Sequence, residues 1–240
     1  MNNQSQIQSQ NQSQNQSQIQ SQNQSQIQSQ GHGFTFENDV RKTVFDLPVE
    51  KNNTEKHDIP KNKNRFNENE NCSIKTTGSG TICCSSIISF YNYDFTEKNT
   101  IIVIKYRQEG NLKVVKRIYE IDYNLKCHKL LFGNLTKEVI ENYIEKVKTI
   151  PKNIKGKEAK KIFNYLVEKK KIKKEYPSII QINPKVDRKQ SRVQCSISGF
   201  EKKLKDFITY ISPIETPNLL RGKKIVSSIE SSKRRRNKKT

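Results

Sequence analysis

Asp58 and Lys75 are the pair of residues in this sequence whose types and spacing best suit chemistry on a phosphate. Lys75 lies in an alternating run at 72–76, which predicts a strand with Ser73 and Lys75 on the same face. Asp58 belongs to a preceding extended segment at 54–59. A polar turn joins the two segments, so a hairpin would bring the carboxylate to the ammonium. Such a pair could hold a divalent metal ion and position water against a phosphate.

Both members of the pair also have a purely structural interpretation. Asp58 stands two residues before Pro60, and an acid in that position is common in turns. Lys75 could be an ordinary lysine exposed on a half-buried strand. Its neighbours Ile74 and Thr76 favour a more central position, and the sequence alone leaves both interpretations open.

Glu37 is a third candidate for the same site. Apolar residues spaced four apart predict a helix that begins near Thr35 and turns one stripe toward the core, formed by Phe36, Val40 and Val44. Glu37 lies beside this stripe, so its carboxylate could reach inward at the helix edge. The alternative is a solvated acid in the first turn, where the helix dipole favours a negative charge.

The rest of the chain predicts an α/β fold of the α+β kind, with a mixed sheet. The most apolar segment, 100–107, predicts a central strand covered on both faces, and a turn at Gly110 leads into a second strand at 112–122. Further strands are expected at 178–183 and 192–198. Helices are expected at 85–93, 136–147, 157–174 and from about 199. In the helix at 157–174, the residues expected to be buried are Ile162, Tyr165 and Leu166.

Composition divides the 240 residues into three parts. Residues 1–30 are a repeat of Gln, Ser and Asn, which predicts disorder because too little apolar surface is available to offset the ordering entropy. Residues 31–216 predict one domain, with a core at about 31–123 and a basic part at about 136–211. Residues 217–240 predict a disordered basic tail.

The formal charge of +21 is concentrated toward the C-terminal half. Residues 31–150 hold 19 Lys and Arg against 16 Asp and Glu, whereas residues 151–220 hold 17 against 7 and residues 221–240 hold 9 against 1. Such a surface attracts polyanions, and its uneven placement favours a nucleic-acid partner. The alternative is a Lys-, Asn- and Ile-rich composition inherited from an AT-rich genome.

Cysteine usage and hydropathy predict an intracellular protein. The five cysteines form no C-x-x-C pair, so free thiols are expected and zinc is not. The N-terminus is polar and no apolar run approaches the ~20 residues that span a bilayer, so neither a signal peptide nor a membrane partner is expected. The basic run at 233–239 fits a nuclear-import signal or a phosphate-binding arm, which leaves cytoplasm and nucleus both open.

A basic hairpin tip is the best candidate for contact with bases. The residues concerned are Lys185, Arg188, Lys189, Gln190, Arg192 and Gln194. Arg and Gln side chains can read guanine and adenine edges, whereas the lysines of the helix at 157–174 are better placed for phosphate. A solvated basic loop is the alternative.

Three short pieces, in their order along the chain, resemble a known family. They are the segment at 33–37 with Glu37, Asp58-Ile59-Pro60, and Ser73-Ile74-Lys75-Thr76-Thr77. Followed by a helix and an apolar strand, they resemble the common core of the PD-(D/E)XK superfamily, the restriction-endonuclease-like fold, and within it a divergent type II restriction-type endonuclease. The segments at 183–187 and 192–197 are similar to the C-terminal part of such proteins. The resemblance covers roughly residues 31–211.

The resemblance implies an endonuclease that hydrolyses phosphodiester bonds of double-stranded DNA with Mg²⁺. Asp58 would ligate the metal ion, and Glu37 would support it directly or through water. Lys75 would orient or help deprotonate the attacking water and stabilise charge on the phosphate. Ser73 would belong to the catalytic group in place of the acid that the family usually has there, although a hydroxyl is a weak Mg²⁺ ligand.

The serine at position 73 leaves two other functions open. One is a non-catalytic DNA- or RNA-binding protein on the same fold, and the other is a basic protein that packages nucleic acid. Glu70 cannot replace Ser73, because an offset of three along a strand points to the opposite face unless a bulge intervenes. Cutting both strands of a duplex would favour a homodimer.

Overall fold

The computed structural model describes residues 35–49, 56–187 and 191–230. The predictions for the repeat at 1–30, for Arg188, Lys189 and Gln190, and for the basic end at 231–240 lie outside the described residues. Within the described ranges, no helix combines the length and the apolar character that crossing a membrane requires.

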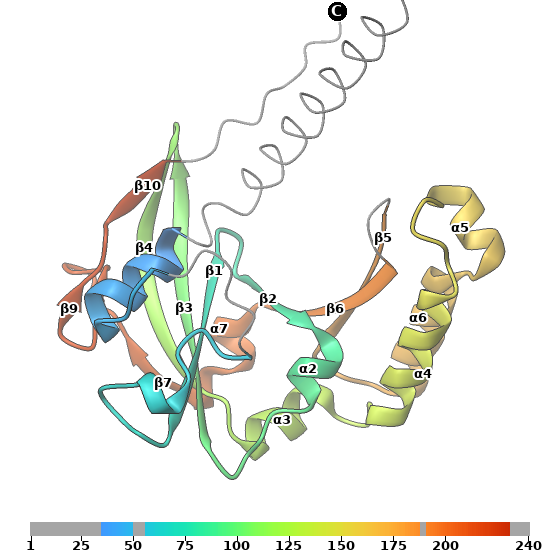
Figure 1. Ribbon diagram of the computed structural model, residues 1–240, viewed down its shortest axis with the longest axis horizontal. Helices are drawn as coiled ribbons and strands as arrows, with labels where there is room; N and C mark the ends of the chain where they lie inside the picture. Colours follow the sequence, from blue (N-terminus) through green and yellow to red (C-terminus); the bar gives the residue numbers. More distant parts are fainter. Residues whose placement is uncertain (1–34, 50–55, 188–190, 231–240) are drawn as a thin grey trace, which may run out of the picture.

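A five-stranded mixed sheet forms the centre of the fold (Figure 1). Its strands are β1 (Glu70–Thr77), β3 (Lys98–Glu109), β4 (Leu112–Asp122), β7 (Ile208–Ile211) and β10 (Ser228–Glu230). β3 lies between β1, to which it is parallel, and β4, to which it is antiparallel. Both β7 and β10 also pair with β4. These pairings confirm the predicted α/β class with a mixed sheet and the predicted central hairpin.

A second sheet and three helices lie beside the central sheet (Figure 1). The sheet is antiparallel, in the order β2 (Thr81–Ser86), β6 (Ser191–Ser198), β5 (Gln181–Val186). The helices are α4 (Lys137–Lys148), α5 (Gly156–Ile162) and α6 (Tyr165–Glu175). Shorter elements are η1 (Val40–Val44), η2 (Lys61–Lys63), α2 (Ile87–Tyr91), α3 (Leu125–Phe132), α7 (Phe200–Lys203), η3 (Lys205–Phe207), β8 (Leu219–Leu220) and β9 (Lys223–Lys224).

The predicted core at 31–123 and the predicted basic part at 136–211 are interleaved rather than separate. β6 pairs with β2, and β7 pairs with β4, so each sheet contains strands from both parts. A boundary drawn from charge and composition cannot anticipate this, because strand pairing joins segments that are far apart in the sequence.

Two apolar cores cover the two faces of the central sheet. On one face, helical residues 35–45 pack against Ile102 and Ile104 of β3. This helix buries the predicted stripe completely: Phe36, Val40 and Val44. On the other face, α2, α3, α4 and the second sheet pack against Ile101 and Val103. Because successive strand residues point to opposite faces, the side chains of β1 divide between the same two faces.

The prediction of one helix at 157–174 is wrong. Phe163 is extended after α5, and Asn164 begins α6 by accepting a hydrogen bond from the backbone N–H three residues on, at 3.4 Å. An Asn cap stabilises a new helix start, which apolar periodicity does not reveal. The break changes which side chains face inward: Ile162 and Leu166, predicted to be buried, are 47% and 39% exposed.

The predicted disordered tail is wrong for residues 217–230. β8, β9 and β10 form there, and their segment places Leu220, Ile225 and Ile229 in the core that also holds the helix at 35–45. The lysines and arginine between these apolar residues made the segment look like a solvated tail, although its apolar positions are enough to anchor it.

Arg221 joins this C-terminal segment to the central sheet through a buried charge network. Its guanidinium donates to both carboxylate oxygens of Glu70, at 2.8 and 3.1 Å, and to Glu120 at 2.5 Å. It also lies against the rings of Phe45 and Phe66, 5.4 and 5.3 Å from their centroids. Bidentate pairing is a strong form of charged hydrogen bond, so Arg221 holds β1, β4 and the C-terminal segment together.

This network predicts a loss of stability in acid. Burial alone would raise the pKa of Glu70, but hydrogen bonds, first of all from Arg221, outweigh it and lower the pKa to about 2. Ionised Glu70 therefore contributes stability that is complete above the ordinary pKa of 4.5 and is lost as the pH falls toward 2. In Glu70→Gln, which should be about 3 kcal/mol less stable at pH 7, this part of the pH dependence should be missing.

Denaturant titrations of both proteins between pH 7 and pH 2 measure this difference. The free energies of unfolding should converge as the pH falls below 4.5. A gap between the two proteins that is constant over the whole range would contradict the assignment.

Candidate active site

Asp58 and Lys75 lie side by side, as their spacing predicts. Lys75 Nζ is 3.3 Å from Asp58 Oδ2, and the two side chains are 22% and 20% exposed. An antiparallel bridge between Ile59 and Cys72, with N–H···O distances of 2.9 and 2.8 Å, produces this neighbourhood. Because the bridge is antiparallel, Asp58, which precedes Ile59, lies beside Ser73, which follows Cys72. Ser73 and Lys75 are two residues apart and share one face of the strand.

The predicted strand at 54–59 is reduced to this single bridge, and its residues 54 and 55 lie outside the described ranges. The N–H of Ile74, which a longer ladder would give to a backbone carbonyl, donates to Asp58 Oδ2 at 2.5 Å. The Asp58 carboxylate therefore accepts the hydrogen bond that a backbone carbonyl would accept in a longer ladder. This bond fixes the position of the carboxylate.

Arg41 fixes the backbone at Asp58. Its side chain is fully buried and donates to the backbone carbonyl of Asp58 and, at 3.4 Å, to that of Pro48. Arg41 comes from the helix at 35–45, so the candidate site is tied to the helix that covers the other face of the sheet. Sequence reasoning missed this residue, and its position directly after the apolar stripe residue Val40 was the only available signal.

Lys75 keeps its positive charge. Burial alone would lower the pKa of Lys75, but the charge of Asp58, with smaller contributions from Tyr93 and Cys84, raises it above its usual value. A lysine with a raised pKa is a poor general base near neutral pH, but it supplies a fixed positive charge. This charge suits the expected role of stabilising charge on a phosphate, while the expected roles of orienting or deprotonating water stay predictions.

Ser73, Tyr93 and His57 surround the pair. Ser73 is buried, with its Oγ 3.0 Å from Tyr93 Oη. Burial raises the pKa of Tyr93, which keeps the phenol neutral. His57 packs edge-on against the Tyr93 ring at 5.0 Å, and burial lowers its pKa. His57 Nδ1 is buried and has no hydrogen-bond partner in the described part of the chain.

Sequence reasoning missed Tyr93 and His57. His57 precedes Asp58 directly, so adjacency to a candidate acid was an available signal. Tyr93 follows α2, and no local pattern connects it with Ser73, which is twenty positions earlier. Contacts of this kind depend on the tertiary fold and cannot be read from spacing.

Glu37 lies on the helix that packs against one face of the central sheet, the face to which Ile74 points. Ser73 and Lys75 point to the opposite face of the sheet. The role of Glu37 as a metal ligand stays a prediction. Among the described residues, no group of three or more His, Cys, Asp and Glu side chains is arranged to hold a metal ion. Asp58 Oδ2 accepts from the Ile74 N–H and from Lys75 Nζ, while Oδ1 has no partner among the residues that the structure describes and could face a cation.

The hairpin formed by β5 and β6 carries the described members of the predicted DNA-contacting set. Lys185 and Arg192 are partners across the hairpin and both are exposed. Gln194 lies two residues further along β6, on the same face, and is half-buried. The structure therefore brings these three residues together on one surface, while contact with DNA stays a prediction.

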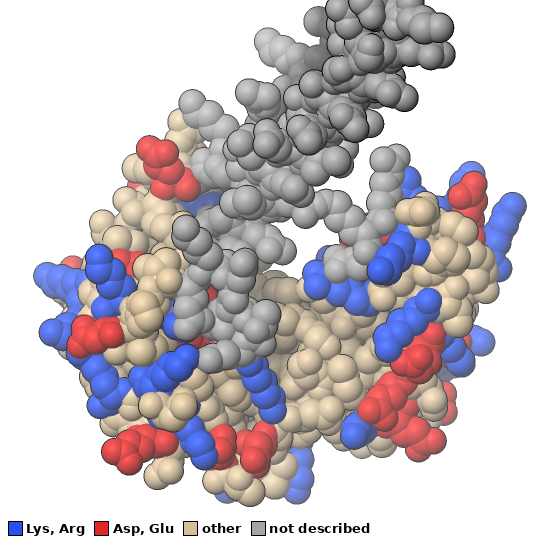
Figure 2. Space-filling model, viewed as in Figure 1, with Lys and Arg blue, Asp and Glu red and all other residues tan. Residues whose placement is uncertain are grey.

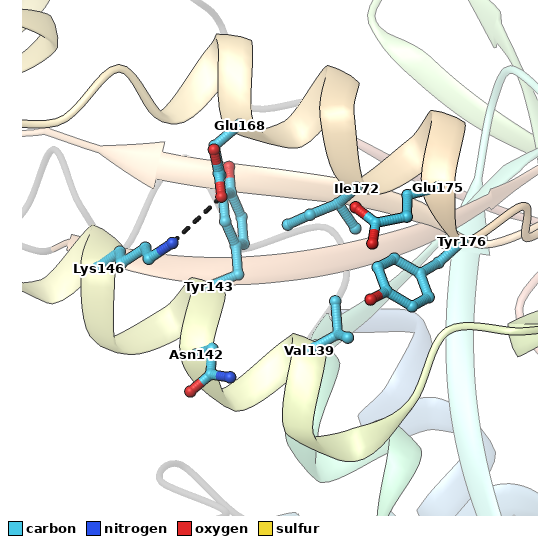
Figure 3. Close-up of a pocket in the computed structure, with 8 residues that line it drawn as sticks. All are labelled: Val139, Asn142, Tyr143, Lys146, Glu168, Ile172, Glu175 and Tyr176. Carbon is cyan, nitrogen blue, oxygen red and sulfur yellow. Dashed lines mark hydrogen bonds and ion pairs between the residues drawn. The ribbon is translucent and has the colours of Figure 1, made fainter.

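A separate pocket of about 170 Å³ lies between α4 and α6 (Figure 3). Lys146 and Glu168 form an ion pair of 3.2 Å across it, and Tyr143 donates a hydrogen bond of 2.7 Å to the Tyr165 carbonyl. None of the predicted site residues lines it. These two contacts join the helices, and we do not assign the pocket a function.

Comparison with protein-family models, with curated proteins and with solved structures found no significant match to this chain. No activity, ligand or partner therefore comes from a relative.

The contacts of Asp58 predict a graded loss of stability. Asp58→Ala removes the acceptor of the Ile74 N–H and the counter-charge of Lys75, which should lower the free energy of unfolding by about 1–3 kcal/mol. Asp58→Asn keeps an oxygen acceptor and should lose less. Urea titration of both variants measures the difference, and equal losses would mean that the carboxylate does not hold the strand edge.

Proposed function

We propose that this protein is a Mg²⁺-dependent endonuclease that hydrolyses phosphodiester bonds of double-stranded DNA. The observation that carries the proposal is the contact of 3.3 Å between Lys75 Nζ and Asp58 Oδ2 in a partly buried site. A carboxylate and an ammonium side by side on one face of the sheet could hold a metal ion and neutralise a phosphate.

Asp58 fits a Mg²⁺ ion that is shared with the substrate. Mg²⁺ commonly takes one or two carboxylates, keeps several waters and completes its coordination with substrate phosphate oxygens. Asp58 Oδ1 would be the protein ligand, and water and phosphate oxygens would complete the coordination. Glu37 is left out of this proposal, because its helix covers the opposite face of the sheet. When bound, the ion would polarise the phosphate and lower the pKa of a bound water.

The side chains have separate roles in this proposal. Lys75 would donate to a phosphate oxygen and stabilise the charge that develops there, since a lysine side chain ordinarily carries a positive charge near neutral pH. The backbone N–H of Ile74 and the Arg41 guanidinium hold Asp58 in place. Ser73, held by Tyr93, contributes a hydroxyl at the edge of the site.

The arrangement of elements supports the resemblance to the restriction-endonuclease-like core. The helix with Glu37, the Asp58 segment, the strand with Lys75, α2 and β3 follow in the expected order, and β1 and β3 are parallel neighbours. The helix at 35–45 and α2 lie on opposite faces of the sheet. We infer this core for the protein on those grounds.

Contact with DNA would involve the basic side chains of the second sheet and of α5 and α6. Figure 2 shows Lys and Arg side chains projecting from the part of the molecule that holds α5 and α6. Lys185 and Arg192, which are partners across the β5–β6 hairpin, would add two positive charges to this surface. Cleavage of both strands would be served by a homodimer.

A non-catalytic nucleic-acid-binding protein is the second candidate function. Ser73 in place of an acid and the lack of a three-ligand group among the described residues favour it. It predicts salt-sensitive binding to DNA without cleavage under any divalent metal ion, and unchanged binding when Asp58 or Lys75 is replaced.

Incubation with supercoiled plasmid DNA tests the proposal. We expect nicking or linearisation with Mg²⁺ and none with a chelator. Asp58→Asn and Lys75→Met should each lower the rate by about a hundredfold or more, because each removes charge that the transition state needs. The rate is measured as the loss of the supercoiled band with time on an agarose gel.

Lys126→Met on α3 is the matched control, because it removes one exposed lysine from another part of the surface. It should cleave at the rate of the unmodified protein. Cleavage that survives both Asp58→Asn and Lys75→Met would end the assignment of this site. No cleavage with any divalent metal ion, together with intact DNA binding, would favour the second candidate.

A further inference from the structure

Two cysteines of the second sheet lie opposite each other on neighbouring strands. β2 and β6 are antiparallel, and their register shifts so that Cys84 and Ser85 of β2 stand against the single residue Cys195 of β6. Two residues opposite one form a β-bulge. Ser85, with a φ of 62°, is exposed, whereas Cys84 is buried. Cys84 is therefore the residue of the bulge that faces Cys195 inside the core.

The two thiols are neighbours in the core that the second sheet shares with the central sheet. Cys84 is 5% exposed, and Cys195 is fully buried. Burial raises the pKa of Cys195 well above its usual range, and a hydrogen bond with the Cys84 thiol adds to this effect. Residues directly opposite in antiparallel strands have Cα atoms about 4.5 or 5.5 Å apart. Both separations lie within the range of about 4.4–6.8 Å that a disulfide bridges.

The cysteine pair also lies close to the candidate active site. The charge of Cys84 is among those that raise the pKa of Lys75, so the two side chains are near each other. β2 follows β1, the strand that carries Lys75, after a turn of three residues at 78–80. A covalent bond between β2 and β6 would therefore brace the part of the structure next to Lys75.

We propose that Cys84 and Cys195 are a redox-sensitive pair, which hydrogen peroxide converts into a disulfide that joins β2 to β6. The sulfur of Cys84, the less buried of the two, attacks one peroxide oxygen. The O–O bond breaks, a sulfenic acid forms, and the released hydroxide leaves as water with the thiol proton. The sulfur of Cys195 then attacks the sulfenic sulfur, the S–O bond breaks, and a second water leaves. Two thiols are oxidised to one disulfide, and one peroxide is reduced to two waters.

The disulfide stabilises the fold. Cys84 and Cys195 are 111 positions apart, and a bond that closes so long a loop removes many conformations of the unfolded chain. A dithiol reductant reverses the change, because it returns both sulfurs to thiols. Neither step involves DNA or a metal ion, so the inference does not depend on the proposed function. The alternative is that both cysteines serve only as small apolar side chains that fill the core.

Treatment of the reduced full chain with hydrogen peroxide in native buffer tests the proposal. After the remaining thiols are blocked with iodoacetamide, digestion and mass spectrometry without reductant should show the peptides of Cys84 and Cys195 joined, with the loss of two hydrogens. Dithiothreitol should separate them. Cys83→Ser is the matched control, because it removes the exposed neighbouring thiol, and it should still form the bond. Cys84→Ala should not form it, and this variant also reports when peroxide oxidises Cys83.

Urea titration measures the effect of the bond on stability. Oxidation should raise the midpoint of unfolding by about 1 M in the unmodified chain and in Cys83→Ser, and dithiothreitol should restore the original value. In Cys84→Ala and in Cys195→Ala, oxidation should leave the midpoint unchanged. Circular dichroism verifies that each variant is folded, and the two alanine variants test the pair independently should one of them fail to fold.

Three results would overturn the proposal. The first is that Cys84 and Cys195 stay reduced at a peroxide concentration that oxidises Cys83. The second is a bond from either residue to Cys83 or to Cys127, which is also near Cys84, in place of the bond between them. The third is a midpoint of unfolding that does not rise on oxidation. The outcome is separable from that of the proposed activity, since a chain that cuts DNA and never forms the disulfide would contradict this inference alone.

Discussion

The carboxylate of Asp58 holds the candidate site together. Its Oδ2 accepts the N–H of Ile74 and contacts Lys75, so one oxygen both ends the strand ladder and fixes the position of the lysine. Its backbone carbonyl accepts from the buried Arg41, which connects the site to the helix on the other face of the sheet. The other oxygen, Oδ1, makes none of these contacts and is the group through which the site could hold a metal ion.

β1 sorts its polar residues between two unrelated tasks. Glu70 points to one face, where Arg221 and Glu120 complete a buried network that anchors the C-terminal segment. Ser73 and Lys75 point to the other face, toward Asp58. The expectation that Glu70 cannot take the place of an acid at position 73 is confirmed, because Glu70 is fully engaged on the opposite side of the strand. The site therefore depends on the carboxylate of Asp58 and the ammonium of Lys75.

Local patterns were enough for part of the fold and of the site. The helix with Phe36, the hairpin of β3 and β4 and the helix α4 follow from periodicity and capping, and the Asp58–Lys75 contact required only one short connection. The break at Asn164 depends on a side-chain cap within a lysine-rich segment, and the order of residues 217–230 depends on apolar side chains meeting a distant helix. Arg41 and Tyr93 reach the site through tertiary contacts alone.

The most direct test of the proposed site is a structure of the full chain bound to a DNA duplex with Ca²⁺ in place of Mg²⁺, since both ions take oxygen ligands. We predict a backbone phosphate between Asp58 and Lys75, with the ion on Asp58 Oδ1 and the Lys75 ammonium on a phosphate oxygen. Phosphate and ion bound elsewhere, with the Asp58–Lys75 pair closed on itself at 3.3 Å, would contradict it.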